Sequence, residues 1–334
     1  MDSRVLSLFT GAAGLDVGLE EAGYDVSVCV EQNKERCEIL SRNRPEWSIV
    51  NQDVRIVTGR ALLRLARLKK YGHFIISGGA PCGAFSKAAF WLPYRFTAHR
   101  RDPRRTLLFE FARIVSQTRP VGFIFENVAS LSYAPNRRYL TAFLRLIRKA
   151  GYTTSMSILD ASQYGIAQKR DRLFIVGSRD GIRFVFPRPT RTVSCEDAIG
   201  HLDNGVIRDD ERLGGKWGHL LDEVPPGDNY LYFTRKRGYP KPIFRWRSRY
   251  YSFLAKLSPK KPSWTIPASP AYYGGPFHWR SRRLRIKEVR LLQTYPENWW
   301  LPGSYAKAWA AIGDATPRHL AKIIGREMQR QCIA

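Results

Sequence analysis

The sequence predicts an α/β fold with a doubly wound, mostly parallel sheet and a second, smaller domain. Over the first 180 residues, short β-branched and apolar runs alternate with stretches of helical spacing, as in strand–helix–strand units. After about residue 185 this alternation stops, and Pro, Gly, Arg and aromatic residues dominate. A helical pattern returns near the end of the 334-residue chain, which is long enough for two domains.

Five apolar runs are the predicted strands of the sheet, and a short sixth run at 48–50 lies between the second and the third. The five are VLSLF (5–9), VSVCV (26–30), HFIIS (73–77), VGFIF (121–125) and RLFIVG (172–177). Because helical stretches separate most of them, the sheet is expected to be mostly parallel.

The clearest predicted helix is RDPRRTLLFEFARIV, where Asp102 can cap the first turn and Pro103 suits the first helical position. Its apolar side is formed by Leu107, Phe111, Ile114 and Val115. Two further stretches have helical spacing, one at Leu62, Leu65 and Ala66, the other at Leu140, Phe143, Leu144 and Ile147, which ends at Gly151.

The predicted boundary between the domains is FPRPT (186–190), where the composition changes. We expect a first domain built from 1–185 plus 305–334 and a second from 186–304, which includes a hinge. In the tail DATPRHLAKIIGREM, Thr316 can cap a helix, Pro317 can start it, and one side is apolar. The inward-facing residues are expected to be Leu320, Ile323 and Ile324, so that the tail packs on the first domain.

The charge of the chain indicates a polyanionic partner. Lys and Arg number 55 against 29 Asp and Glu, which gives a formal net charge of +26. Residues 229–287 contain no Asp or Glu but fifteen Lys or Arg, interleaved with Tyr, Trp and Phe. Basic charge among aromatic rings suits phosphate contacts and base stacking, so a nucleic-acid surface is favoured over an ordinary basic face.

Several classes of protein are excluded by composition. The start MDSRVLSLFTG lacks the features of a signal peptide, and no apolar segment approaches the ~18 residues of a membrane span. The five cysteines are scattered without a CxxC pair or a His/Cys cluster, so we expect no metal site and no disulfide framework. A reducing cytoplasm is the expected compartment.

The segment LSLFTGAAGLDVGLEEAGY (6–24) reads as a strand, a Gly/Ala-rich turn and a helix, which can bring backbone N–H groups close to a ligand. Glu31 ends the next strand about twenty residues later, where a carboxylate can accept both hydroxyls of a ribose. Asp53 follows the short apolar run at 48–50 and could reach an adenine amino group. Three successive strand ends therefore predict a nucleoside pocket at the carboxyl edge of the sheet.

A cysteine and a carboxylate follow the next two strands on the same edge. Cys82 lies in GGAPCGAFS and Glu126 in ENV, so the two are expected near each other. In QKRDR, alternation would place Gln168, Arg170 and Arg172 on one face. A buried structural cysteine and a basic strand edge remain the simpler alternatives for each motif alone.

Together these motifs resemble the DNA cytosine-5 methyltransferases of bacterial restriction–modification systems, in order and over nearly the whole chain. The matching blocks are FTGAAG, Glu31, Asp53, PC, DPRRTLLFEF, ENV, QKRDR, RRLRIKEVRLLQTYPENW (282–299) and GDATP (313–317). The resemblance implies a Rossmann-like domain that binds S-adenosyl-L-methionine and yields S-adenosyl-L-homocysteine. It also implies that the second domain recognises the target sequence in double-stranded DNA.

The resemblance implies that Cys82 attacks carbon 6 of a flipped cytosine while the methyl group goes to carbon 5. Glu126 would stabilise the ring, Arg172 would contact O2 with Arg170 in support, and these arginines would help to hold the thiolate. The implied cofactor residues are Phe9, Gly11, Gly14, Leu15, Glu31, Asp53, Val54, Pro81, Asp314 and Ala315. The expected DNA contacts are Ser86, Gln168, Arg235, Lys236, Arg237, Arg245, Arg247 and Arg249.

Three positions depart from the pattern of that family. Ala13 stands where a second glycine is usual, and Gly83 replaces the glutamine common after PC. Asp314 stands where asparagine is typical. These changes leave the thiol, the ENV glutamate and the arginines in place, but the space beside Cys82 lacks its usual side chain.

Three other functions are weighed against this one. A tRNA cytosine-5 methyltransferase shares the blocks but usually carries a Cys-Phe-Thr signature, which is absent here. A non-catalytic DNA-binding protein on the same fold would not need Cys82, Glu126 and Arg172. A nicotinamide dehydrogenase would also suit Glu31.

The resemblance leads us to expect a monomer in the cytoplasm of a prokaryotic or phage-infected cell. The role would be protection of host DNA, with a restriction endonuclease encoded nearby but not bound, or else that of an orphan or phage methyltransferase.

Overall fold

The computed structural model describes residues 3–85, 102–247 and 250–333, and it divides the chain into two compact units. The first unit contains 1–160, 171–188 and 315–334, and the second contains 161–170 and 189–314. Compared with the predicted division, the segment 161–170 lies in the second unit, and the chain returns to the first unit ten residues later than expected. Among the described residues, no helix is long and apolar enough to cross a bilayer.

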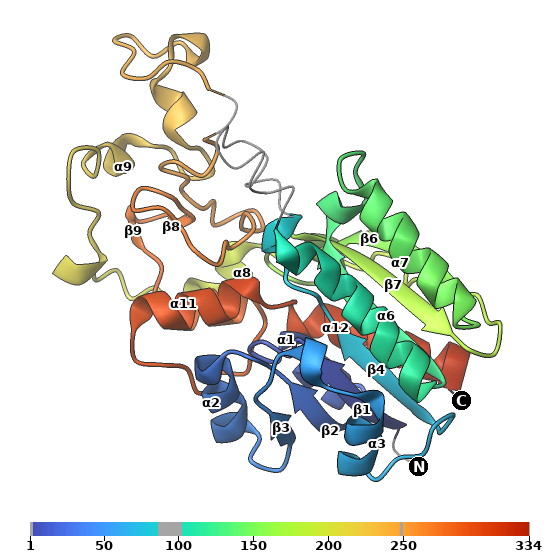
Figure 1. The fold of residues 1–334 in the computed structure, drawn as a ribbon. Coiled ribbons are helices and arrows are strands. Elements are labelled where there is room, and N and C mark those ends of the chain that lie inside the picture. Colours follow the sequence, from blue (N-terminus) through green and yellow to red (C-terminus); the bar gives the residue numbers. More distant parts are fainter. Residues whose placement is uncertain (1–2, 86–101, 248–249, 334) are drawn as a thin grey trace. The chain divides into compact units, whose positions relative to one another are not determined.

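The first unit is built on a seven-stranded sheet in the order β3-β2-β1-β4-β5-β7-β6 (Figure 1). The strands are β1 Ser3–Leu8, β2 Tyr24–Val30, β3 Ser48–Val50, β4 Phe74–Gly78, β5 Gly122–Val128, β6 Thr153–Asp160 and β7 Asp171–Ser178. The first five are parallel, whereas β7 runs antiparallel to both β5 and β6. The predicted mostly parallel α/β sheet is therefore confirmed, and β6 is the strand that was not predicted.

Helices cover both faces of this sheet (Figure 1). They are α1 Gly14–Glu20, α2 Lys34–Asn43, α3 Gly59–Leu65, α6 Leu107–Thr118, α7 Arg137–Lys149 and α12 Arg318–Met328. One apolar cluster joins Leu6 and Leu8 of β1 to Leu62 of α3, Phe111 of α6 and Phe143 of α7. On the opposite face α12 packs against α1, so the sheet is doubly wound.

The helix predictions hold with two corrections. Asp102 caps a short turn, Pro103–Thr106, that leads into α6, and the four predicted apolar residues of α6 are buried. Leu65 of α3 is 48% exposed, so it does not face the core. In the tail, α12 packs on the first unit as expected, but its N-cap is Pro317, without a side-chain cap from Thr316.

The second unit has little regular structure in its described part. Its elements are α8 Cys195–Ile199, α9 Leu220–Glu223, β8 Phe277–His278, β9 Arg282–Arg283, α10 Ile286–Leu292 and α11 Tyr305–Asp314. An aromatic and aliphatic cluster, which includes Tyr230, Phe233 and Phe277, forms one core of the unit. Many of its rings meet edge to face, as at Phe233 and Tyr239 with centroids 5.0 Å apart.

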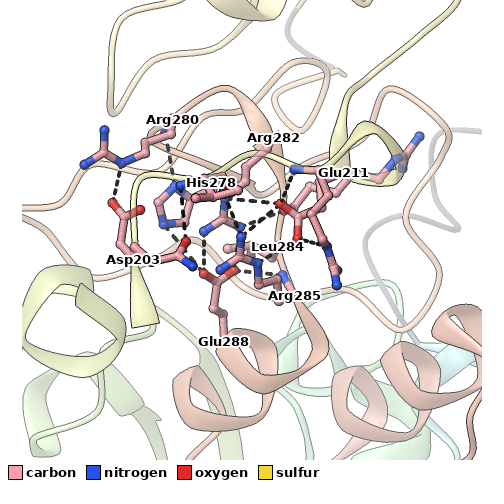
Figure 2. A network of polar contacts seen from close by, with 12 residues as sticks. Asp203, Glu211, His278, Arg280, Arg282, Leu284, Arg285 and Glu288 are labelled. Atoms are coloured by element: carbon pink, nitrogen blue, oxygen red, sulfur yellow. Dashed lines mark hydrogen bonds and ion pairs between the residues drawn. The ribbon is translucent and has the colours of Figure 1, made fainter. Parts of the chain in front are cut away.

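A buried network of charged groups forms the other part of this interior (Figure 2). Arg282 donates to both carboxylate oxygens of Glu288, at 2.9 and 2.6 Å, and both side chains are fully buried. Arg285 reaches Glu211 at 2.6 Å. His278 lies 3.7 Å from Glu288, and burial lowers the pKa of His278 to about 3, so this ring is neutral. The network ties together segments up to 83 residues apart in sequence.

Candidate active site at the carboxyl edge of the sheet

The register of the sheet brings the predicted site residues of the first unit to one edge. Leu8 pairs with Val30 and with Gly78, and the row continues to Val50 and Phe125. The residues that follow these positions are at the carboxyl edge, where ligands bind in open α/β sheets. Glu31 directly follows Val30, the loop with Pro81 and Cys82 begins after Gly78, and Glu126 directly follows Phe125.

Glu31 and the first loop are tied together at this edge. Gly11 N–H donates to Oε2 of Glu31 at 2.8 Å, and Asn33 N–H donates to Oε1 at 2.8 Å. Each carboxylate oxygen can accept further hydrogen bonds, which leaves Glu31 suited to two ribose hydroxyls. The Gly/Ala-rich loop and Glu31, which were expected at the same edge of the sheet, are thus joined directly by a hydrogen bond.

The loop before α1 has an unusual backbone. Phe9, Gly11 and Ala13 have positive φ values of 57°, 59° and 66°, so every second residue is left-handed. A Cβ on Gly11 would meet nothing closer than 3.9 Å, which leaves the backbone open to a ligand. Ala13 is buried and adopts a conformation that glycine tolerates better. The loop thus leaves its backbone open to close approach by a ligand.

Asp53 caps the turn Val54–Ile56 and is paired with Arg55. The Arg55 N–H donates to the Asp53 carboxylate at 2.9 Å, and its guanidinium donates at 2.5 Å. The hydrogen bond from the Arg55 side chain is the main cause that lowers the pKa of Asp53, so the carboxylate is ionised. An ionised acceptor at this strand end suits an amino group of adenine.

Two glycines shape the start of the loop that carries Cys82, residues 78–85, which we call the cysteine loop. A Cβ on Gly78 would lie 2.2 Å from Leu8 O, and one on Gly79 would lie 2.8 Å from Oε2 of Glu126. Only glycine allows the loop to pass between β1 and the Glu126 carboxylate. Cys82 then begins a short turn, Cys82–Ala84, and is partly exposed.

Side chains from β5 and the turn after it hold the cysteine loop. Asn127 donates to Ala80 O at 2.8 Å, and Ser130 donates to Phe85 O at 2.7 Å. These bonds bracket Cys82 on both sides. Sequence reasoning used Glu126 of ENV but missed Asn127, although the same triplet contains it.

Glu126 and Arg172 form an ion pair beside the cysteine loop. Nε of Arg172 lies 2.8 Å from Oε1 of Glu126, and the two side chains are only 11% and 13% exposed. Because β7 is antiparallel to β5, the first residues of β7 return to this same edge. The structure therefore brings Glu126 and Arg172 together, as the sequence predicted.

Arg170 and Gln168 belong to the second unit, where they are buried. Arg170 donates to Ile266 O at 3.0 Å and to Gly313 O at 2.8 Å. Gln168 donates to Leu292 O and to the side chain of Gln293, and it is 0% exposed. The structure does not support a DNA contact by Gln168, and it gives Arg170 a framework role in its own unit.

The remaining predicted cofactor residues fall on both sides of the division between the units. Gly14 and Leu15 begin α1, Val54 is buried beneath Asp53, and Ala315 is buried in the first unit. Asp314 is the last residue of α11, and it is exposed in the second unit. No cluster of three or more His, Cys, Asp or Glu groups that could hold a metal occurs in the described part of the chain.

Apart from the buried Gln168, the predicted DNA contacts of the second unit are exposed wherever the structure describes them. These are Arg235, Lys236, Arg237, Arg245 and Arg247, while Ser86 and Arg249 lie outside the described residues. Nζ of Lys236 lies 4.3 Å from the ring of Trp246, which is 39% exposed. Tyr250, Tyr251 and Tyr272 are more than half exposed, and sequence reasoning did not single them out.

The family of the chain follows from comparison with known proteins. A family model described as C-5 cytosine-specific DNA methylase matches residues 3–330. The chain belongs to this family. The Type II methyltransferase M.SacI of Streptomyces achromogenes is 32% identical over 365 residues, which cover 98% of this chain and 93% of that protein. M.Eco47II of Escherichia coli is 31% identical, with 97% and 78% covered.

Solved structures of similar fold cover the whole chain. An Escherichia coli prophage protein described as a DNA modification methyltransferase matches with a TM-score of 0.71, 21% identity and 99% of both chains. Spodoptera frugiperda DNMT2 matches with a TM-score of 0.66, 14% identity, and 97% and 98% of the two chains. At these identities the likeness is one of fold.

As a member of the C-5 cytosine-specific DNA methylase family, this protein is a DNA (cytosine-5-)-methyltransferase of the restriction–modification type. S-adenosyl-L-methionine is the methyl donor, and DNA is the substrate. This membership decides against the nicotinamide dehydrogenase that Glu31 alone left open.

Proposed function

We propose that the protein methylates a cytosine flipped out of duplex DNA, through a covalent bond between Cys82 and carbon 6 of the base. The observation that carries this proposal is the row across the sheet from Val50 to Phe125. Along this row the loop before α1, the cysteine loop and the Glu126–Arg172 pair lie at one edge of the sheet. A thiol, a carboxylate and a guanidinium beside a methyl donor are the groups that this reaction needs.

The chemistry explains why a cysteine is needed. Carbon 5 of cytosine is a weak nucleophile, and inside a duplex the base is inaccessible, so it must leave the stack at a cost of a few kcal/mol. Addition of the Cys82 thiolate to carbon 6 makes carbon 5 electron-rich. S-adenosylmethionine, when bound, supplies an electrophilic methyl group. After transfer, carbon 5 loses its proton, the bond from sulfur to carbon 6 breaks, and the thiolate is restored.

Glu126 and Arg172 act on the flipped ring. Addition of sulfur at carbon 6 moves electron density onto N3 and O2. The Glu126 carboxyl group is proposed to share a proton with N3, and the Arg172 guanidinium to donate to O2. Their short ion pair, largely shielded from water, keeps both groups oriented before the base arrives.

The second unit is proposed to recognise the target sequence. The exposed cations between Arg235 and Arg247 suit phosphate and guanine contacts, and Trp246 and Tyr250 offer rings for stacking. Arg282 and Arg285 are committed to the internal network and are not part of this surface.

Trapping on modified DNA tests the covalent step. Duplex DNA with 5-fluorocytosine in the target retains the adduct, because fluorine cannot leave carbon 5 as a proton does. Wild type with S-adenosylmethionine is expected to give a denaturation-resistant complex, and Cys82→Ser none, with methyl transfer reduced at least ~1000-fold. If wild type binds the cofactor and methylates DNA but forms no adduct, the covalent mechanism is wrong. The matched control is Cys37→Ser, which changes a thiol on α2 of the same unit.

We also propose that methylation protects DNA in a restriction–modification system, because the relatives that span the chain are named Type II methyltransferases. Bisulfite sequencing of DNA from cells that express the protein would define the modified sequence. Plasmids carrying this modification are expected to resist an endonuclease that cleaves the same sequence. Methylation without a short, fixed sequence would argue against a protective role.

A further inference from the structure

The geometry points to Arg104 as the cation that positions and stabilises the Cys82 thiolate, with Gly83 as the residue that leaves room for it. This inference deepens the proposed function and rests on Cys82 as the nucleophile. It concerns a side chain that sequence reasoning placed only within the helix start DPRRTLLFEF. It also answers what occupies the space beside Gly83.

The Arg104 guanidinium lies against the backbone of the residue that follows Cys82. A Cβ built on Gly83 would be 3.2 Å from Nη1 of Arg104, 3.6 Å from Cζ and 3.7 Å from Nη2. Almost any side chain at position 83 would therefore press on the guanidinium. With glycine there, the charged group can lie against the turn that carries the thiol.

Arg104 is held in place by Asp102. The Asp102 carboxylate accepts the backbone N–H of Arg104 at 2.9 Å, Nε at 3.0 Å and Nη2 at 2.6 Å. Pro103 between them occupies the first position of the turn, where its fixed φ favours this geometry. The neighbouring Arg105 is buried, with its guanidinium 5.5 Å from the Phe85 ring centroid. Arg104 thus lies against the middle residue of the cysteine turn, and Arg105 against the residue that follows the turn.

The electrostatics of Arg104 agree with this placement. The hydrogen bond to Asp102 raises the pKa of Arg104, burial opposes the rise, and the charge of Cys82 adds to it. An interaction between two charges is reciprocal, so the cation that the thiolate stabilises also stabilises the thiolate. Thiolates beside an arginine are formed at lower pH than isolated thiols.

The two arginines that the sequence suggested for this task are engaged elsewhere. Arg172 is paired with Glu126 through Nε, and Arg170 donates to backbone carbonyls within the second unit. Arg104 belongs to the same unit as Cys82, and its side chain is 56% exposed. It is a positioning residue that acts through the thiol.

The test is the pH profile of Cys82 alkylation by iodoacetamide, read by peptide mass spectrometry so that the other thiols do not interfere. In Arg104→Gln the profile is expected to move to higher pH, with alkylation at pH 7 about fivefold to tenfold slower. Arg104→Lys should recover part of the rate. The matched control is Arg330→Gln, which removes another exposed arginine paired with a carboxylate, Glu327, and should leave the profile unchanged.

A second substitution keeps the test independent of folding defects at position 104. Gly83→Ala places a methyl group against the guanidinium and should move the profile in the same direction by a smaller amount. Unchanged alkylation profiles in both Arg104→Gln and Gly83→Ala would overturn the inference. Methyl transfer should fall about tenfold in Arg104→Gln with cofactor affinity unchanged. If wild type itself forms no adduct on 5-fluorocytosine DNA, the proposed function fails, whereas the alkylation profiles still decide the role of Arg104.

Discussion

The two units bury carboxyl groups in opposite ways. In the first unit Asp16 is 1% exposed, Ser77 donates to it at 3.1 Å, and burial raises its pKa to about 6. In the second unit burial would also raise the pKa of Glu211, but the hydrogen bonds from Arg285 and Arg208 and the charges of Arg285 and Arg282 together overcome this and lower it to about 2. Burial raises the pKa of one carboxyl group, and arginines lower the pKa of the other.

This difference reflects how each interior is made. The sheet of the first unit satisfies its own backbone and fills its core with aliphatic and aromatic side chains, so charged groups are left for the edge. The second unit has short elements, and its Arg282–Glu288 and Arg285–Glu211 pairs link distant segments instead. Part of the large positive charge of the chain is therefore architectural and does not face DNA.

The largest expected effect comes from removing one partner of the buried ion pair. Glu288→Ala would remove the bidentate partner of the fully buried Arg282 and leave it only Glu211, whose carboxylate lies 3.8 Å from Nε, which should destabilise the second unit by about 3 kcal/mol. Hydrogen exchange read by mass spectrometry would measure this loss unit by unit. Peptides of the sheet in the first unit should keep their protection.

A double variant shows whether charge as such is required. Replacing the pair by apolar residues of similar volume, Arg282→Met with Glu288→Leu, should restore most of the lost stability, because a buried ion pair costs desolvation that an apolar pair does not. If the double variant is as unstable as Glu288→Ala, two other hydrogen bonds matter more than the ion pair itself. They are the bond that Arg282 donates to Arg283 O and the bond that Glu288 accepts from Arg285 N–H.

The second-largest expected effect is a change in the stability of the first unit with pH. Because its folded pKa lies above the ordinary 3.8, Asp16 contributes stability below pH 4, and that contribution is lost as the pH rises through 6. Asp16→Asn should thus stabilise the first unit at pH 7.5 by about 3 kcal/mol and have little effect at pH 4. Denaturant unfolding of both proteins at the two pH values would measure this difference. Destabilisation at both pH values would mean that Asp16 is needed as an ionised acceptor.

The sequence predicted the first unit better than the second for physical reasons. Buried parallel strands appear as apolar runs, so five strands and the cap at Asp102 could be predicted from local patterns. β6 was missed because it is an edge strand whose Met156 and Ile158 are exposed among polar residues. The pairing of Arg285 with Glu211 spans 74 residues and leaves no local signal.

In the candidate site, too, some features could be predicted from the sequence and others could not. Glu126 and Arg172 were expected together from the family resemblance, whereas strand order alone does not bring them together, because Arg172 returns to the edge of Glu126 only through the antiparallel direction of β7. The commitment of Arg170 to Gly313 O could not be predicted, because it depends on how α11 ends in the second unit. The motif QKRDR looks continuous in sequence, yet the two units divide it between Arg170 and Asp171.

The smallest expected effect concerns backbone strain in the loop before α1 of the first unit. Ala13 has φ 66° and Ala12 does not have a positive φ, although both are buried in the same turn. Changing either to glycine removes a buried methyl group and adds freedom to the unfolded chain, at a cost of about 1 kcal/mol. At Ala13 glycine also relieves the left-handed conformation, which is worth about 1 kcal/mol. Ala13→Gly should therefore be nearly neutral and Ala12→Gly destabilising in thermal unfolding. Equal losses would show that the loop stores no strain at Ala13, and that the alanine found there is as well suited as the usual glycine.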